Sequence, residues 1–405
     1  MNNIYSEFED KVVRSEFNTV MPVSDLNFNT PNNYTVFKLD HGDSFYNGRI
    51  QFHITGKLVK TDGSAYAANS GVKLVNNFPA FLFRRIELKK HNFLIDYVDH
   101  VGITSTVKSL VSYPNSSAEN LYSSGFLSRF DGGGNFEALG TLGHLGLGFF
   151  DHLQYPMFKG GFEVTFIRAE DNDAIFRWTP TGGTEAAAGK VVIESFVLRV
   201  PLVEYAPTSK IQLIDKLVSL SGQDGLVYNY LQWQCIEKNG VVGTNFNFDI
   251  TNAYRNVFNP KFIIIGLQKA RSNDQKKNPS GFDSENIKNV SVKINKDVYP
   301  QELINLDITN GKHRILYDMY QNFRRVATGK DDSYLNEANF IEKYPIAVID
   351  TSLHPVTIDR SKNDIMVQLD FVNALAAESN IAAYVVVVSQ TFFSYDITRN
   401  LIKMQ

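Results

Sequence analysis

A strand, a polar turn, a second apolar stretch and an amphipathic segment follow one another at two separate places in this chain. The first copy is "FRRIELKKHNFLID" (83–96) and the second is "NVSVKINKDVYPQE" (289–302). Aligning the two turns pairs Ile86 with Val290 and Leu88 with Val292, at an offset of 204 residues in a chain of 405. A recurrence at about half the chain length predicts two tandem copies of one unit.

A second pair of segments supports the same alignment. "GFEVTFIRA" (161–169) matches "DIMVQLDFV" (364–372) at an offset of 203, and each is followed by a loop and a long apolar strand. The shared order carries the inference, because any single alternating strand is common. We expect eight positions to be repeated core positions of these strands: Ile86, Leu88, Val164, Phe166, Val290, Val292, Val367 and Leu369.

Alternation of apolar and polar residues between turn residues predicts many short strands, as in an all-β sandwich or barrel. The 30 Phe and 19 Tyr suit the half-buried surfaces of sheets, and 43% hydrophobic with 20% charged residues indicates a folded globular chain. The expected strands are 49–59, 83–90, 162–169, 191–200, 245–250, 261–268, 290–294, 364–372 and 382–393.

Only two segments have the period of a helix, 96–113 and 309–323. The first stops before Pro114 and the second follows a Thr309 or Asn310 cap. They occupy the same place in the two copies, and an offset of 208 pairs Val107 with Ile315 and Val111 with Met319. The expected apolar faces are Tyr97, Val101, Val107, Leu110 and Val111 in the first helix, and Ile315, Met319, Tyr320 and Phe323 in the second.

Charge and cysteine content narrow the class of protein. The formal charge of −3 lacks the basic excess of a protein that wraps nucleic acid by itself. Cys235 is the only cysteine, so we expect no intrachain disulfide, folding in a reducing compartment and a buried strand thiol. The N-terminus does not read as a signal peptide, and the apolar run 381–388 is shorter than the ~20 residues of a membrane helix.

Signatures of catalysis and cofactor binding are missing: there is no phosphate loop, GxSxG elbow, HExxH or CxxC. The glycine-dense stretch 131–152 does not have the order of strand, GxGxxG and helix, so we expect a long flexible surface loop or an interface arm. We expect no catalytic residue, cofactor or metal.

Other polar clusters have ordinary structural explanations. We interpret the histidines near carboxylates (40–43, 96–100 and 149–152) as surface residues, because none has a fixed ligand spacing. The basic segments 269–278 and 323–334 are expected to be solvated loops. The carboxylate pairs Glu163 with Asp171 and Glu194 with Glu204 are expected on outward-facing strand positions.

The repeated elements and their order resemble the double jelly-roll major capsid proteins of the adenovirus and tectivirus lineage, and most closely those of the Maverick/Polinton and adintovirus group. The resembling stretches are "NNFPAFLFRRIELKKHNFLID" with the following helix, "FNPKFIIIGLQ", "NPSGFDSENIKNVSVKINKDVYP" and the closing segment from Asp364 to Ile402. The resemblance extends from about Gly48 to Ile402.

The resemblance implies two tandem eight-stranded jelly rolls with short helices between strands, and a structural role. Three chains would form a pseudohexagonal capsomer, and many capsomers an icosahedral shell. We expect an N-terminal arm at 1–40 that reaches a neighbour or the capsid interior, a first jelly roll at 41–205 and a second at 206–405, with short outer towers from 123–160 and 269–286.

The expected partners are other copies of the chain, penton proteins and minor capsid proteins, with no specific nucleic-acid binding and no membrane insertion. The expected location is the virion, after synthesis in the host cytoplasm. Two alternatives remain open at this stage. One is a glycan-active enzyme or lectin on two jelly rolls, with converging carboxylates or an aromatic platform. The other is a minor capsid or scaffold-like protein of the same fold.

Overall fold

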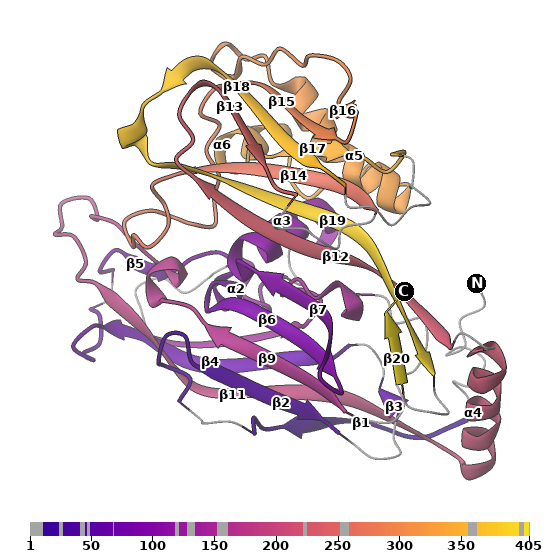
Figure 1. Ribbon diagram of the computed structural model, residues 1–405. Helices are drawn as coiled ribbons and strands as arrows, with labels where there is room; N and C mark the ends of the chain where they lie inside the picture. Colours follow the sequence, from indigo (N-terminus) through magenta and orange to yellow (C-terminus); the bar gives the residue numbers. More distant parts are fainter. Residues whose placement is uncertain are drawn as a thin grey trace.

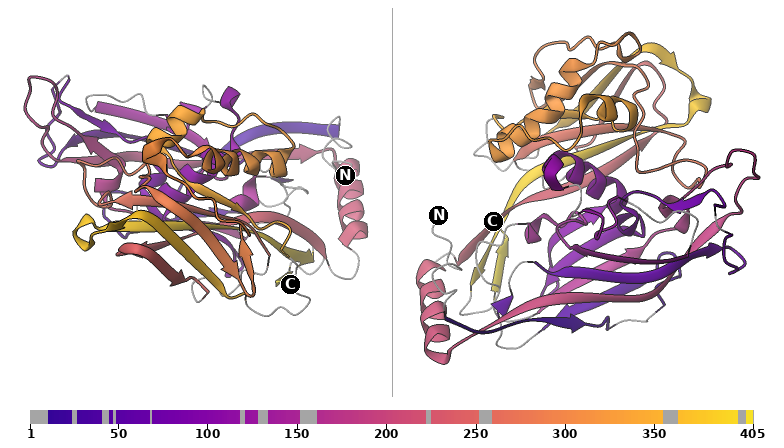
Figure 2. Two further views of the ribbon diagram at one scale, coloured as in Figure 1. Left: turned by 90° about the horizontal axis from the view of Figure 1, so that it is seen from above. Right: turned by 180° about the vertical axis from the view of Figure 1, so that it is seen from behind.

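The computed structural model describes residues 11–23, 27–40, 45–46, 49–67, 69–117, 121–127, 134–151, 161–221, 225–251, 259–354, 363–396 and 401–404. Strands dominate and form two β-sandwiches, one from each half of the chain. Figure 1 shows the two sandwiches stacked, with the first half below and the second above, and the right-hand view of Figure 2 shows the same arrangement from behind.

The first sandwich consists of two antiparallel sheets whose inner faces pack together. One sheet has the strand order β1-β11-β4-β8, with the short β3 beside β11, and the other has the order β2-β9-β6-β7. The strands are β1 (Val12–Val20), β2 (Tyr34–Leu39), β3 (Phe45–Tyr46), β4 (Gln51–Lys60), β6 (Phe83–Lys90), β7 (Phe93–Asp99), β8 (Gly134–Thr141), β9 (Phe162–Arg168) and β11 (Gly189–Tyr205).

The second sandwich repeats this construction. Its sheets have the orders β12-β19-β14-β17, with β20 beside β19, and β13-β18-β15-β16. The strands are β12 (Leu226–Asn239), β13 (Gly243–Asp249), β14 (Pro260–Lys269), β15 (Ile287–Ile294), β16 (Asp297–Tyr299), β17 (Ala347–Asp350), β18 (Ile365–Leu375), β19 (Ile381–Asp396) and β20 (Leu401–Met404).

Strand order is identical in the two sandwiches. When the eight main strands of each are counted along the chain, one sheet has the order first, eighth, third, sixth and the other second, seventh, fourth, fifth. This arrangement of eight strands is a jelly roll, built from two Greek keys. The predicted fold class, all-β with two tandem jelly rolls, is confirmed.

Helices lie in the connections between strands. The helix α3 (Val101–Ser112) and the helix α5 (Arg314–Thr328) each join the fifth strand of a unit to its sixth, so they are equivalent elements. The others are α2 (Phe78–Phe81), α4 (Pro207–Ser221) between the two units, and α6 (Glu337–Lys343). A small additional sheet joins β5 (Val72–Leu74) to β10 (Ile175–Arg177).

The predicted helix 96–113 is wrong in its first turn. Tyr97 lies in β7, where Val98 pairs with Ile86 of β6, and the helix begins only after His100, whose backbone is left-handed. The hydrogen bonds between β6 and β7 therefore determine the structure of residues 96–99, although their apolar residues have helical spacing.

The predicted helix 309–323 starts too early, because α5 begins at Arg314. Ile315 is 49% exposed, whereas Val107 is buried, so the pairing of these two residues is also wrong. Two residues of the predicted apolar face of α5, Tyr320 and Phe323, are buried, and Leu316 is buried beside them in place of Ile315.

The segment 1–40 is not wholly an arm. Within it, β1 pairs with β11 and β2 pairs with β9, so both are integral strands of the first jelly roll. The helix α4 begins at Pro207, directly after the expected boundary between the two jelly rolls at residues 205 and 206. Proline is tolerated in the first turn of a helix because the N–H groups there have no intrahelical partner.

Candidate functional site: the contact between the two units

The eight expected repeat positions occupy equivalent places in the two units. In the first unit Ile86 pairs with Phe166 and Leu88 with Val164, across β6 and β9. In the second unit Val290 pairs with Leu369 and Val292 with Val367, across β15 and β18. All eight side chains are at most 1% exposed: Ile86, Leu88, Val164, Phe166, Val290, Val292, Val367 and Leu369.

These positions build the two cores and do not lie between the units. Phe166, for example, packs against Phe37, Phe83 and Phe196, with ring centroids 4.9 to 5.7 Å apart. The polar and aromatic groups that join the units come from other elements, and an interface had been expected for one of them, the stretch 131–152.

The first strand of the second unit lies directly against the first unit. β12 contacts β7 and the 3₁₀ turn η4 (Gly148–Phe150), which follows β8. Gly148 is required there, since a Cβ atom on it would overlap the carbonyl oxygen of Leu231. Tyr230 of β12 donates a hydrogen bond from its hydroxyl to the backbone oxygen of Ile95, at 2.6 Å. Backbone and side chains of the two units are therefore in close contact.

An aromatic cluster fills the centre of this contact. The ring of Phe149 lies 6.0 Å from that of Tyr228, 5.6 Å from that of Tyr230 and 5.7 Å from that of Phe393, measured between centroids. All four side chains are buried. Phe149 belongs to the first unit and its three neighbours to the second, so apolar burial holds the units together.

Two equivalent helices meet at a second part of the contact. Tyr320 of α5 donates a hydrogen bond to the carbonyl oxygen of Leu110 in α3, at 2.8 Å. Arg324 donates to the carbonyl oxygen of Ser112 and forms an ion pair with Asp332, at 2.7 Å. These bonds satisfy carbonyl oxygens at the C-terminus of α3, which have no partner inside the helix.

The connection between β14 and β15 forms a third part. Gln275 is buried and donates to the carbonyl oxygen of Gly189 at 2.8 Å, while its Oε1 accepts from the N–H of Gly189 at 2.9 Å. The N–H of Asn273 donates to Asp173 at 2.7 Å. The expectation of a fully solvated loop at 269–278 is therefore wrong, because this segment docks on the first unit.

Two buried ionisable groups lie beside the contact. Asp96 in β7 accepts a hydrogen bond from the N–H of Phe149 at 3.1 Å. Burial raises the pKa of Asp96 to about 7, although this N–H and the charge of Lys108 oppose the rise. Burial lowers the pKa of Lys90 to about 8, and its ammonium lies 4.2 Å from the ring centroid of Phe162 and 4.8 Å from that of Tyr395.

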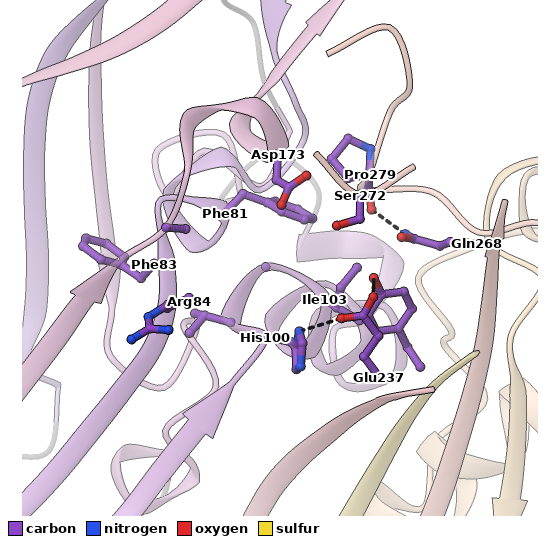
Figure 3. A pocket seen from close by; sticks show the side chains of 14 residues that line it. Phe81, Phe83, Arg84, His100, Ile103, Asp173, Glu237, Gln268, Ser272 and Pro279 are labelled. Carbon is purple, nitrogen blue, oxygen red and sulfur yellow. Dashed lines mark hydrogen bonds and ion pairs between the residues drawn. The ribbon is translucent and has the colours of Figure 1, made fainter. Parts of the chain in front are cut away.

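A pocket of about 100 Å³ lies between the units (Figure 3). Several of its polar groups interact with neighbouring residues. Glu237 accepts a hydrogen bond from Tyr384 at 3.1 Å and lies 3.8 Å from Nδ1 of His100. Gln268 donates to the carbonyl oxygen of Pro279 at 2.7 Å. These interactions cross-link loops and strands at the edge of the contact, and they suit a structural role better than a chemical one.

The glycine-dense stretch 131–152 is described from Gly134 to Asp151. The expectation of a flexible surface loop is wrong for it, because β8 forms its first part and residues 142–150 are buried. The alternative expectation, an interface arm, agrees with the contacts of Gly148 and Phe149. Residues 131–133 and His152 lie outside the described residues.

Other candidates have local partners. Asp171 forms an ion pair with Arg168, and Glu194 forms one with Lys57 at 2.8 Å. Glu163 and Glu204 are on β9 and β11. Cys235 is buried in β12. In the basic segment 323–334, Arg324 and Arg325 form ion pairs. Among the histidines near carboxylates, His41 lies outside the described residues.

Two searches of the described residues found nothing. No group of three His, Cys, Asp or Glu in these ranges could hold a metal ion. None of the helices in the same ranges combines the length and apolar character needed to cross a membrane.

Comparison of structures places the chain beside viral coat proteins. The Faustovirus major capsid protein matches with a TM-score of 0.63 and 10% identity, covering 94% of this chain and 90% of that one. The capsid of PBCV-1 virus matches at 0.58 and 10%, covering 94% of both chains. The mavirus major capsid protein matches at 0.52 and 13%, covering 96% and 90%. At these identities the likeness concerns the fold.

Comparison of sequences gives the family. No curated protein sequence matches the chain. Residues 72–392, however, match the family model described as the double jelly roll-like domain, and this range runs from β5 in the first jelly roll into β19, the last main strand of the second. The chain therefore belongs to the double jelly roll-like domain family.

Proposed function

We propose that this chain is a viral major capsid protein without enzymatic activity, and that three copies form a pseudohexagonal capsomer that tiles an icosahedral shell. The observation that carries this proposal is the pair of eight-stranded units with identical strand order, docked tightly inside one chain. Three such chains around a threefold axis present six similar units, which is close to a hexagonal tile. The capsid proteins that share the fold support the same role.

Finer parts of the proposal follow from this role. We place the chain in the virion after synthesis in the host cytoplasm, with penton and minor capsid proteins as further partners. We also propose a relationship to the Maverick/Polinton and adintovirus capsid proteins, on the resembling segments quoted above. The limits of the two domains follow the strands: the first domain ends near Tyr205, and the second begins near Leu226.

The native mass of the full-length protein tests the proposal, together with negative-stain images of the same sample. We expect a particle of three times 45.7 kDa with a hexagonal outline, or closed shells. A protein that stays monomeric under all conditions of salt and concentration would contradict the capsomer. A glycan array and a hydrolase screen would then test the remaining class, a glycan-active enzyme or lectin.

A further inference from the structure

The contact inside the chain joins two unlike faces. The first unit contributes its fifth strand, β7, and the connection that follows its sixth strand, which carries Phe149. The second unit contributes its first strand, β12. A contact between unlike faces is heterologous, so the first unit retains an unused first-strand face and the second unit an unused fifth-strand face unless a ring closes.

The unused faces can be identified from the identical strand order. On the first unit the unused first strand is β1, the equivalent of β12. On the second unit the unused fifth strand is β16, and the connection after its sixth strand begins at Thr351. Figure 1 shows β1 and β16 at opposite ends of the molecule, with the contact between the units in the middle.

Apolar side chains are exposed on the first of these faces. Four residues on β1 and just after it form what we name the β1 surface, and between 48% and 69% of each is exposed: Val13, Phe17, Met21 and Val23. β12, in contrast, buries Tyr228 and Tyr230 in the contact between the units. β1 is an edge strand that pairs only with β11 among the described strands, so it lacks the cover that β12 has.

The second unused face is apolar as well. Four residues form what we name the Leu353 surface, and between 37% and 92% of each is exposed: Val298, Leu303, Ile315 and Leu353. Val298 lies on β16 and Ile315 at the start of α5. Leu353, the most exposed of them, lies in the connection that follows β17, as Phe149 lies in the connection that follows β8. In the first unit this connection inserts an apolar side chain into the neighbouring unit.

We propose that the β1 surface of one copy packs against the Leu353 surface of the next copy, and that this interface repeats between chains the contact that joins the two units within a chain. The inference rests on the proposed capsomer and adds the surfaces through which its chains associate. Exposed apolar side chains on the elements of both faces favour burial against a partner, and four such residues on each face are more than the single exposed apolar residues that need none. A second copy fits, because it carries the complementary face.

Two single substitutions test the interface, one on each surface. Phe17→Asp and Leu353→Asp each place a charge on an exposed position, so we expect the monomer to keep the thermal midpoint of a dissociated wild-type monomer. We expect each variant alone to lose the trimer in native mass spectrometry. The matched control is Val242→Asp, another exposed apolar position that belongs to neither surface, and we expect it to stay trimeric.

Mixing the two variants tests whether the surfaces meet each other. The Phe17→Asp chain keeps an intact Leu353 surface, and the Leu353→Asp chain keeps an intact β1 surface. We therefore expect an equimolar mixture to form a 1:1 heterodimer that grows no further, which chemical cross-linking and native mass would detect. If both substitutions instead damaged a single surface that pairs with its own copy across a twofold axis, the mixture would form no such dimer.

The outcomes separate this inference from the proposed function. A wild-type protein that never trimerises refutes the capsomer itself. A trimeric wild type whose two variants also remain trimeric, or whose monomeric variants form no heterodimer, refutes only the interface. If either variant melts early, Met21→Asp and Leu303→Asp replace the pair, because both residues are more than 60% exposed.

Discussion

Replacing Asp96 by asparagine should stabilise the protein at pH 8 and have a smaller effect at pH 5. The carboxyl of Asp96 is fully buried beside the contact between the units, and its pKa rises from an ordinary 3.8 to about 7. The folded state therefore binds the proton more tightly than the unfolded state does. The stability that this proton contributes is complete below pH 3.8 and is lost as the pH rises towards 7.

The magnitude follows from the size of the shift. About three pKa units correspond to about 4 kcal/mol at roughly 1.4 kcal/mol per unit, and this is the free energy that ionising Asp96 costs the folded protein above pH 7. Asparagine stays neutral and keeps an oxygen to accept the N–H of Phe149. The interval from pH 5 to pH 7 covers two of these three pKa units. The gain in free energy of unfolding from Asp96→Asn should therefore grow by about 3 kcal/mol over that interval.

Urea unfolding of the wild type and of Asp96→Asn at pH 5 and pH 8 measures this difference. The control is Asp99→Asn on the same strand, whose carboxylate pairs with Arg85 at 2.9 Å near the surface, so its loss should not stabilise the protein at either pH. If Asp96→Asn changes the free energy of unfolding equally at pH 5 and pH 8, ionisation of Asp96 is not the cause. The reasoning from burial would then be refuted.

Three other substitutions probe the same contact. Gly148→Ala should destabilise the protein by at least about 2 kcal/mol in thermal unfolding, because the added methyl overlaps the carbonyl oxygen of Leu231. Tyr320→Phe should cost about 1–3 kcal/mol in urea unfolding, because the carbonyl oxygen of Leu110 loses its donor in a buried place. Lys90→Met should stabilise the protein at pH 7 by about 2 kcal/mol in the same assay. That gain should fall as the pH rises from 8 to 10.5, where the wild-type lysine also becomes neutral when unfolded.

Matched surface changes serve as controls for two of these three, Gly148→Ala and Lys90→Met. Gly183→Ala adds a methyl whose nearest neighbour is 3.5 Å away, so its thermal midpoint should stay within about 2 °C of wild type. Lys57→Met removes a charge from an exposed ion pair. Its free energy of unfolding should therefore not exceed that of the wild type at pH 7, and the difference should not depend on pH between 8 and 10.5. Equal effects in a test variant and its control would argue against the packing explanation.

Strands with one solvated face were predictable from the sequence. The segment 83–90 matches β6 residue for residue, and 162–169 matches β9 to within one residue, because alternation reports the two faces of a pleated strand directly. The repeat was also visible, since equivalent strands keep equivalent core positions. The bounds of β12 were not predicted, however, although Cys235 was expected to lie in a buried strand. The second face of β12 is buried against the first unit, so its alternation is lost.

The contact between the units could not be predicted in the same way. Gly148 and Phe149 lie in a stretch whose glycines suggested a flexible loop, although one of them allows a close backbone approach. The docking of Gln275 depends on residues 86 positions away, and no local pattern records it. The helix α4 was missed because Pro207 breaks a helix in its interior but not at its start.

The order of strands also determines when the apolar side of the first unit becomes covered during synthesis. All eight strands of that unit are complete at Tyr205, so it can fold as soon as this part of the chain is available. Its partner strand β12 is made next, but β12 pairs with β19, which ends only at Asp396. At about 5–20 residues per second, roughly 10–40 s pass between the synthesis of Tyr205 and that of Asp396. Until then Phe149 lacks some of the aromatic neighbours that surround it in the folded protein. During that time the apolar side of the first unit lacks the cover that the second unit provides in the folded protein.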